Sequence, residues 1–336
     1  MPFIIVLVLM IVMSCQRQPA SAQTLTLTVG VAGVPMGLGQ TRDYDLIFEQ
    51  LAANGISLFY PVFQYVEAPV AESLGFEVDF IPPCRRNDPS FAAMRRHGIK
   101  LIVPSNLLYA PEGQFPALAD DPLAALIACA GREAVFGVLS FDEPVHNGLS
   151  IETTRDLYNR VKDVAPDMPV LMVHAPLVIE EGRHGTQAAR RAYLSLVAEQ
   201  SRHADIVGFS TYPVPPMVAK MGAPGQGDAV VDHITAAREY VAWLRRTLPE
   251  KRIMSVIQNF SYADQFSPAL LAEVAPPELI AVVKAPTATE LAEMARASED
   301  AGAEFVIWYG AGFTKPADAQ SWLDTLAVSA RISGQR

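Results

Sequence analysis

Cysteine and basic residues are both scarce in this chain of 336 residues. Its three cysteines, Cys15, Cys84 and Cys129, are too few for a disulfide framework or a cysteine-based zinc site. Cys129 lies in an apolar stretch and is expected to be buried, with a Cys84–Cys129 disulfide as the alternative. Lys and Arg number 26 against 36 Asp and Glu, which gives a net charge of −10. Because such a chain repels phosphate backbones, the composition excludes nucleic acid as the partner.

Long hydrophobic runs are also scarce, and the longest is FIIVLVLMIVM at residues 3–13. As a helix this run would span about 17 Å, whereas a bilayer core is about 30 Å thick, so it is typical of a signal peptide. Ala20-Ser21-Ala22 is a cleavage pattern, whereas Val12-Met13-Ser14-Cys15 resembles a lipoprotein box. We therefore predict a signal segment over residues 1–22 and export, to the periplasm or beyond. A lipid on Cys15 would be the only membrane contact.

Several sequence signatures of common enzyme classes are missing. The run Val29-Gly30-Val31-Ala32-Gly33 lacks the third glycine of a dinucleotide-binding fingerprint. No G-x-S-x-G segment indicates a serine nucleophile, and no H-x-H or H-E-x-x-H spacing indicates a metal centre. The sequence therefore predicts neither a cofactor nor a resident metal.

What the chain does contain is a regular alternation of short β-rich runs and longer amphipathic stretches. The runs cover residues 25–33, 56–63, 99–106, 135–141, 169–175, 205–213, 252–260 and 304–310. Their spacing leaves room for a helix and two loops between consecutive strands, and their continuous hydrophobicity favours strands covered on both faces. We predict a single (β/α)8 TIM barrel over residues 24–332, with an open doubly wound sheet as the alternative.

Helix signals between the runs support this interpretation. Leu157, Val161 and Val164 share one face of a helix predicted over residues 152–165. Thr287 and Glu290 form a T-x-x-E capping box that begins another helix. Pro316 is expected to begin the last helix, where a missing N–H group has no consequence.

In a TIM barrel the active site lies where the strands end, so the strand ends name the candidate residues. They carry aromatic, amide, imidazole and carboxyl side chains: Tyr60, Asn106, Asp142, Glu143, His174, Tyr212, Gln258, Trp308 and Tyr309. Aromatic rings pack on the C–H faces of a sugar, amides bind its hydroxyl groups, and a carboxylic acid can protonate a glycosidic oxygen. This set predicts a carbohydrate ligand or substrate.

The fourth strand ends in Phe141-Asp142-Glu143-Pro144, which resembles the Asn-Glu-Pro signature of the large clan of (β/α)8 glycoside hydrolases. Tyr212-Pro213 after the sixth strand and Trp308 at the end of the eighth agree with that resemblance. It implies that Glu143 is the general acid/base. We predict Asp142 as the second catalytic residue and the other strand-end residues as substrate-binding: Tyr60, Asn106, His174, Tyr212, Gln258, Trp308 and Tyr309.

Two positions depart from the clan pattern. Asp142 stands where the clan has Asn, and Gln258 stands where a retaining enzyme has its nucleophilic Glu. An amide cannot form a glycosyl-enzyme, so three routes stay open. In the first, Asp142 orients a 2-acetamido group, as the adjacent Asp-Glu pair of hexosaminidase-type enzymes does. In the second, Asp264 or Glu180 acts as an inverting base. In the third, the barrel binds sugar without cleaving it.

Structural roles are the alternatives for most of these residues. Glu143 can be an ion-pair partner, and Asp142 can cap a loop, since neighbouring strand residues point to opposite faces. Trp308 and Tyr212 can be barrel packing, His174 a core histidine, and Gln258 a partner of a nearby backbone. We predict an exported glycoside hydrolase-like barrel acting on a glycan, with a catalytically silent carbohydrate-binding or scaffold barrel as the alternative. A lesser alternative is a metal-dependent hydrolase using Asp142, Glu143, His146 and His174.

Overall fold

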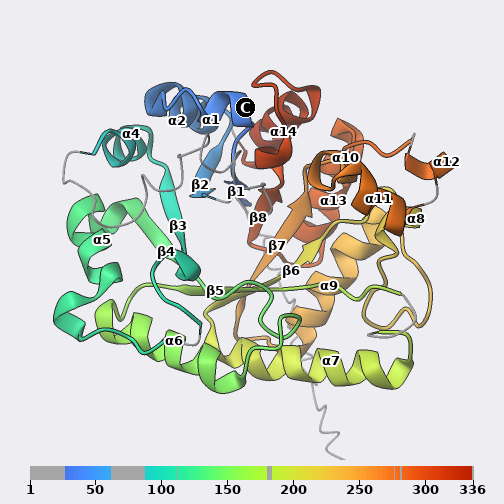
Figure 1. The fold of residues 1–336 in the computed structure, drawn as a ribbon, viewed down its shortest axis with the longest axis horizontal. Helices are drawn as coiled ribbons and strands as arrows, with labels where there is room; N and C mark the ends of the chain where they lie inside the picture. Colours follow the sequence, from blue (N-terminus) through green and yellow to red (C-terminus); the bar gives the residue numbers. More distant parts are fainter. Residues whose placement is uncertain are drawn as a thin grey trace, which may run out of the picture.

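The eight predicted strands form one closed parallel barrel in strand order β1 to β8, with β1 paired to β8 (Figure 1). The computed structural model describes residues 27–61, 88–111, 113–179, 184–275, 277–280 and 282–334. The strands are β1 Thr28–Ala32, β2 Ile56–Tyr60, β3 Lys100–Pro104, β4 Val135–Leu139, β5 Val170–His174, β6 Ile206–Thr211, β7 Arg252–Gln258 and β8 Phe305–Tyr309. The TIM-barrel prediction is confirmed.

One longer helix follows each strand and covers the outside of the barrel (Figure 1). These helices are α2 Tyr44–Ala53, α4 Pro89–His97, α5 Pro122–Ala130, α6 Ile151–Val164, α7 Gln187–Gln200, α9 His233–Thr247, α13 Ala288–Asp300 and α14 Gln320–Ile332. Shorter helices lie in the connections: α1 Met36–Gly39, α8 Pro216–Ala219, α10 Tyr262–Gln265, α11 Pro268–Val274 and α12 Pro277–Ile280. Short 3-10 turns include Ser105–Leu107 and Ala311–Phe313.

Alternation along the strands separates the barrel interior from the layer between strands and helices. In β8, Ile307 and Tyr309 belong to the apolar cluster inside the barrel. Val306 and Trp308 belong instead to the cluster that joins the strands to the surrounding helices. Because successive side chains of a strand point to opposite faces, only every second strand-end residue can reach the mouth of the barrel.

The predicted helix signals are mostly confirmed. Leu157 and Val161 are buried on the inner face of α6. The Thr287 hydroxyl accepts from the Glu290 amide at 3.3 Å, while the Glu290 carboxylate accepts from the Thr287 amide at 2.8 Å, so the capping box begins α13 as expected. The expectation for Pro316 is wrong, because α14 begins at Gln320 and Pro316 lies in the preceding loop.

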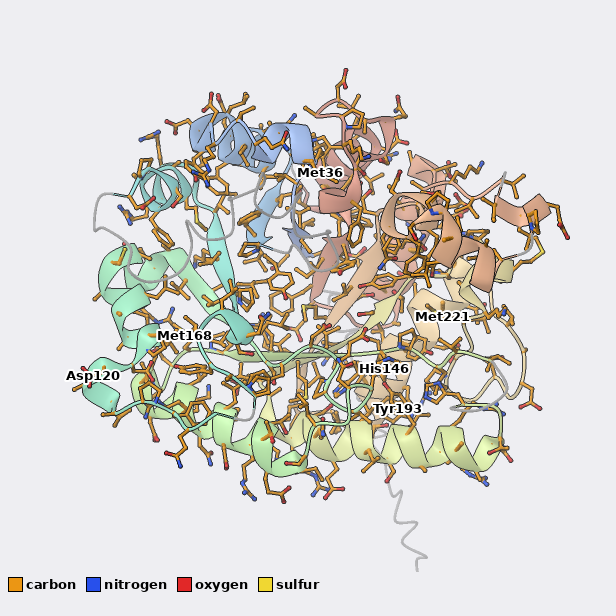
Figure 2. All side chains as sticks on the ribbon, in the orientation of Figure 1. Met36, Asp120, His146, Met168, Tyr193 and Met221 are labelled. Carbon is orange, nitrogen blue, oxygen red and sulfur yellow. The ribbon has the colours of Figure 1, made fainter. Side chains whose placement is uncertain are left out.

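Hydrogen bonds connect the loops at the carboxyl end of the barrel to the surrounding helices. Tyr193 of α7, labelled in Figure 2, donates a hydrogen bond of 2.7 Å to the carbonyl of Ala175, just after β5. Tyr240 of α9 accepts from the amide of Leu177 at 2.6 Å and donates to the carbonyl of Gly222 at 2.8 Å. These buried phenols fix the loops that follow β5 and β6.

Several sequence predictions concern residues beyond the described ranges. The signal segment over residues 1–22, with Cys15, lies outside them, and so does Cys84. Cys129 is buried on α5, as expected, and is disulfide-bonded. Among the residues that the structure describes, no helix combines the length and the hydrophobicity needed to cross a membrane.

Candidate functional site

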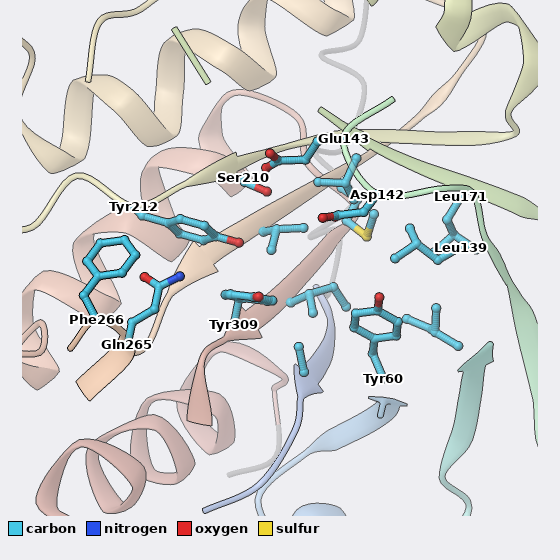
Figure 3. Close-up of a pocket in the computed structure, with 16 residues that line it drawn as sticks. Tyr60, Leu139, Asp142, Glu143, Leu171, Ser210, Tyr212, Gln265, Phe266 and Tyr309 are labelled. Atoms are coloured by element: carbon cyan, nitrogen blue, oxygen red, sulfur yellow. The ribbon is translucent and has the colours of Figure 1, made fainter. Parts of the chain in front are cut away.

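A cavity of about 330 Å³ opens where the barrel strands end (Figure 3). Its floor consists of apolar side chains that point inward from the strands: Ala32, Ile102, Leu139, Leu171, Val173, Met254, Val256 and Ile307. Its polar and aromatic walls are formed by Tyr60, Asp142, Glu143, Ser210, Tyr212, Gln265, Phe266 and Tyr309. Five of the nine predicted site residues therefore meet in one cavity.

Asp142 and Glu143 both face this cavity although they are consecutive residues. They follow the end of β4 rather than lying within it, and Glu143 has a φ of 38°, in the left-handed region. This φ is unusual for a residue other than glycine and breaks the alternation that would separate the two side chains. The turn is held by Asn147, whose side chain donates to the Asp142 carbonyl at 2.7 Å and whose amide donates to the Glu143 carbonyl at 3.0 Å.

The two carboxyl groups lie in a weakly solvated environment. Burial and, after it, the Asp142 charge raise the pKa of Glu143, a hydrogen bond with Ser210 offsets part of the rise, and the resulting pKa is about 7. Burial also raises the pKa of Asp142 above its ordinary value. No lysine or arginine occurs among the described residues that line the cavity. A substantial fraction of Glu143 is therefore protonated near neutral pH, as a general acid requires.

Aromatic rings form another part of the cavity wall. Tyr212 and Tyr309 stack with their centroids 5.2 Å apart and their planes at 19°. Phe260 packs edge-on against both rings, at 5.2 Å from Tyr212 and 6.1 Å from Tyr309. The φ of Gly310 is 107°, and a Cβ there would lie 2.4 Å from the Phe260 ring, so only glycine allows this packing. Burial holds the pKa of Tyr212 well above its usual range.

Three wall residues were not predicted from the sequence. Ser210 lies two residues before Tyr212 on β6, so the alternation of the strand was a usable signal for it. Gln265 and Phe266 come from the segment after β7, where α10 ends. Phe266 stacks on Tyr262 at 5.8 Å, and Tyr262 donates a hydrogen bond of 2.5 Å to the carbonyl of Tyr212. This placement depends on a loop conformation for which the sequence has no local signal.

Trp308 and His174 were expected to face the mouth of the barrel, but their side chains point outward from the strands towards the surrounding helices. Trp308 is fully buried, and its indole nitrogen donates to the Ser329 hydroxyl of α14 at 2.8 Å. The His174 ring is fully buried, with Nε2 2.9 Å from the Ser201 hydroxyl, and burial lowers its pKa to about 3. Both expected placements are wrong, because each residue occupies the outward position of its strand.

Gln258 and Asn106 do not line the cavity either. The Gln258 side chain accepts from the Val214 amide at 2.9 Å and donates to the carbonyls of Val214 at 2.7 Å and Phe260 at 2.9 Å. It is fully buried, so its amide is committed to the backbone around it. Asn106 is exposed in the 3-10 turn after β3. Their predicted contact with substrate is not supported by these positions.

The other proposed partners of Glu143 do not converge on it. Asp264 is exposed on α10 and does not line the cavity, and Glu180 lies outside the described residues. His146, labelled in Figure 2, is exposed on the loop after β4. With His174 in the helix layer, the set Asp142, Glu143, His146 and His174 does not converge. The described part of the chain holds no group of three or more His, Cys, Asp or Glu placed to bind a metal ion.

No protein-family model matches this chain, and no curated protein matches it. Glycoside hydrolase TIM barrels resemble it in structure. A β-galactosidase from the psychrophilic Marinomonas ef1 matches 90% of the chain with a TM-score of 0.54 at 10% identity. A β-galactosidase from the haloarchaeon Halorubrum lacusprofundi matches 92% of the chain with a TM-score of 0.53 at 11% identity.

An endo-β-1,4-mannanase from Thermotoga petrophila matches 93% of the chain with a TM-score of 0.50 at 12% identity. The chain spans 59% and 58% of the two galactosidases and 78% of the mannanase. Identities this low show a shared barrel architecture and leave the chemistry to the cavity itself.

Proposed function

We propose that this protein is an exported glycoside hydrolase that acts on a glycan, with Glu143 as the general acid. The observation that carries this proposal is the position of Glu143, at the carboxyl end of β4 in a cavity where its pKa is about 7. A carboxylic acid that is partly protonated at neutral pH can donate a proton to a glycosidic oxygen as the bond breaks.

The rest of the cavity supports a sugar as the ligand. The stacked pair Tyr212 and Tyr309 offers ring surface for the C–H face of a pyranose, and Ser210 and Gln265 bring groups that can bind hydroxyl groups. The distant resemblance to galactosidase and mannanase barrels is consistent with this interpretation.

Hydrolysis at this site does not use the double displacement of retaining enzymes through β7, because Gln258 is an amide bonded to Val214 and Phe260. Asp142 is the one other carboxylate among the described lining residues. We therefore assign protonation of the leaving oxygen to Glu143 as the glycosidic bond breaks. Water attacks the anomeric carbon while Asp142 orients it and accepts its proton, or a group of the substrate itself attacks and Asp142 orients that group.

The test is a panel of aryl glycosides assayed with the wild type, Glu143→Gln and Asp264→Asn. Glu143→Gln keeps the side-chain shape and removes the proton, so kcat should fall about 100-fold or more on substrates with poor leaving groups, and less on those whose leaving group needs no proton. Wild-type activity should decrease as pH rises above about 7, where Glu143 loses its proton. Asp264→Asn is the matched control, because Asp264 is a nearby carboxylate outside the cavity. Equal activity of the wild type and Glu143→Gln on every cleaved glycoside would overturn the assignment.

A catalytically silent carbohydrate-binding barrel is the second candidate, and the commitment of Gln258 to the backbone favours it. In that case the wild type should bind glycans without cleaving any of them. Glu143→Gln would then change the dissociation constant of the glycan, and no hydrolysis would be seen with either protein. The same panel, combined with calorimetric titration, would show this.

Export is proposed from the apolar run at residues 3–13 together with the processing patterns at Cys15 and Ala22. Intact-mass measurement of protein recovered from a bacterial envelope fraction should give a chain that starts at Gln23 or at a lipidated Cys15. Recovery of an unprocessed chain from the cytosol would contradict this proposal.

A further inference from the structure

The part of the cavity lining that the structure describes carries carboxyl groups and no positively charged side chain. Among the described residues that line it, Asp142 and Glu143 are the only charged side chains, and neither lysine, arginine nor histidine joins them. An anionic ligand, such as a uronic acid or a sialic acid, would place a further negative charge near Asp142 in a weakly solvated space. The electrostatics therefore favour a neutral or cationic ligand.

Asp142 accepts no side-chain or backbone hydrogen bond on its carboxylate from any described residue. Asn147 binds its backbone carbonyl instead, at 2.7 Å. Figure 3 shows the Asp142 carboxylate pointing into the middle of the cavity, whereas Glu143 lies beside Ser210. A half-buried carboxylate of this kind is best stabilised by a ligand that brings both positive charge and N–H donors.

The aromatic wall favours the same kind of ligand. Tyr60 and Tyr309 reach the cavity from the ends of β2 and β8, Tyr212 from the position just after β6, and Phe266 adds a fourth ring at its edge. The faces of such rings attract cations, and the attraction strengthens where water is excluded. Rings and carboxylates around one space are the combination by which proteins bind ammonium groups.

We propose that the substrate of this site carries a free ammonium group that binds Asp142 between the tyrosine rings, which makes it an amino sugar glycan without N-acyl groups. This inference rests on the proposed function for the reaction, since it names the substrate of the same site. The ammonium group pairs with Asp142, and Glu143 remains the proton donor. Burial is the largest cause of the raised pKa of Glu143, ahead of the Asp142 charge that the ammonium group would neutralise.

The experiment uses ligands that differ in one substituent. Oligosaccharides of β-1,4-linked glucosamine, N-acetylglucosamine and glucose share a backbone and carry ammonium, acetamido and hydroxyl groups at C2. Calorimetric titration at pH 6 of the purified full chain would compare them, together with galactosamine, N-acetylgalactosamine and galactose. In at least one of the two series, gluco or galacto, we expect the amino sugar to bind at least tenfold more tightly than its N-acetylated and hydroxyl counterparts.

Two variants make the test specific. Asp142→Asn keeps the shape and removes the charge, so it should abolish the preference for the amine while the fold, followed by circular dichroism, is retained. Asp318→Asn, which changes an exposed carboxylate in the loop after β8, should leave the preference unchanged and controls for long-range charge. If no amino sugar binds, or the acetamido or hydroxyl ligand binds equally well, the inference is wrong.

Hydrolysis assays on the same ligands separate this inference from the proposed function. Cleavage of the neutral glycans without preference for the amine would overturn the inference and leave the hydrolase proposal standing. Tight binding of the amino sugar without cleavage would support the inference and overturn the hydrolase proposal.

Discussion

The indole N–H of Trp308 donates a hydrogen bond of 2.8 Å to the hydroxyl of Ser329, which joins β8 to α14. The Ser329 hydroxyl in turn donates to the carbonyl of Thr325 at 2.7 Å. Trp308 and Ser329 are both fully buried. The aromatic residue that the strand-eight pattern assigned to sugar binding is therefore a packing residue, and its neighbour Tyr309 occupies the wall of the cavity.

Substitution of Trp308 should affect stability rather than binding. Trp308→Phe removes the N–H group and part of the ring, so the free energy of unfolding should fall by about 1–3 kcal/mol. A double-mutant cycle with Ser329→Ala should give a coupling energy of about 0.5–1.5 kcal/mol, measured by denaturant unfolding. Glycan affinity per folded molecule should be unchanged. Weaker binding with an unchanged melting temperature would return Trp308 to the binding site.

Substitution of Tyr309 should have the opposite signature. Tyr309→Leu removes the ring that stacks on Tyr212, so ligand binding should weaken by about 1–2 kcal/mol, or roughly 5- to 30-fold in Kd. Tyr309→Phe keeps the ring and should retain most of the affinity. Calorimetric titration measures both values. If Tyr309→Leu and Trp308→Phe weaken binding equally, the division between inward and outward residues does not govern recognition.

The stability of the protein should depend on pH through Glu143. Its pKa is about 7 in the folded chain and 4.5 ordinarily, so between these values the folded state holds the proton more tightly than the unfolded state. This contribution to stability is present below about pH 4.5 and is lost as pH rises towards 7. Glu143→Gln has no titrating carboxyl group at this position, so it does not lose this stability as pH rises. The unfolding free energy of the variant minus that of the wild type should therefore increase by about 1–3 kcal/mol from pH 4.5 to 8.

Urea unfolding at several pH values would measure this difference. Glu250→Gln changes an exposed carboxylate and should run parallel to the wild type. A difference between Glu143→Gln and wild type that stays constant with pH would show that the Glu143 carboxyl is not shifted.

Restoring a carboxylate at the end of β7 should not restore the chemistry of a retaining enzyme. In Gln258→Glu the side chain would lose the N–H groups that bind the carbonyls of Val214 and Phe260, and burial beside these oxygens would raise the pKa of the new carboxyl group. The unfolding free energy should fall by about 2–4 kcal/mol at pH 7, and by less at low pH, where the carboxyl is protonated. Gln265→Glu, at the cavity wall, is the control. Trapping of a covalent glycosyl-enzyme by Gln258→Glu would contradict this prediction.

Much of the architecture was present in the sequence alone. Eight short hydrophobic runs with room for helices between them predicted the barrel, because each run is covered on both faces and cannot be solvated. The Thr287–Glu290 capping box was equally local, since its bonds join residues three positions apart. The Asp142-Glu143 pair was found because a barrel places its site at the strand ends.

What the sequence did not decide was the direction of each side chain. Trp308 and Tyr309 are neighbours, and only the register of β8 with β1 and β7 determines which one points inward. Gln258 was compatible with a sugar contact until the backbone of Val214, 44 residues away, was placed against it. Asp142 and Glu143 share the cavity because the chain turns through a positive φ at Glu143, held by Asn147. These choices depend on contacts between distant segments, so they belong to the tertiary structure, whereas hydrophobic runs and caps are local and can be predicted from the chain itself.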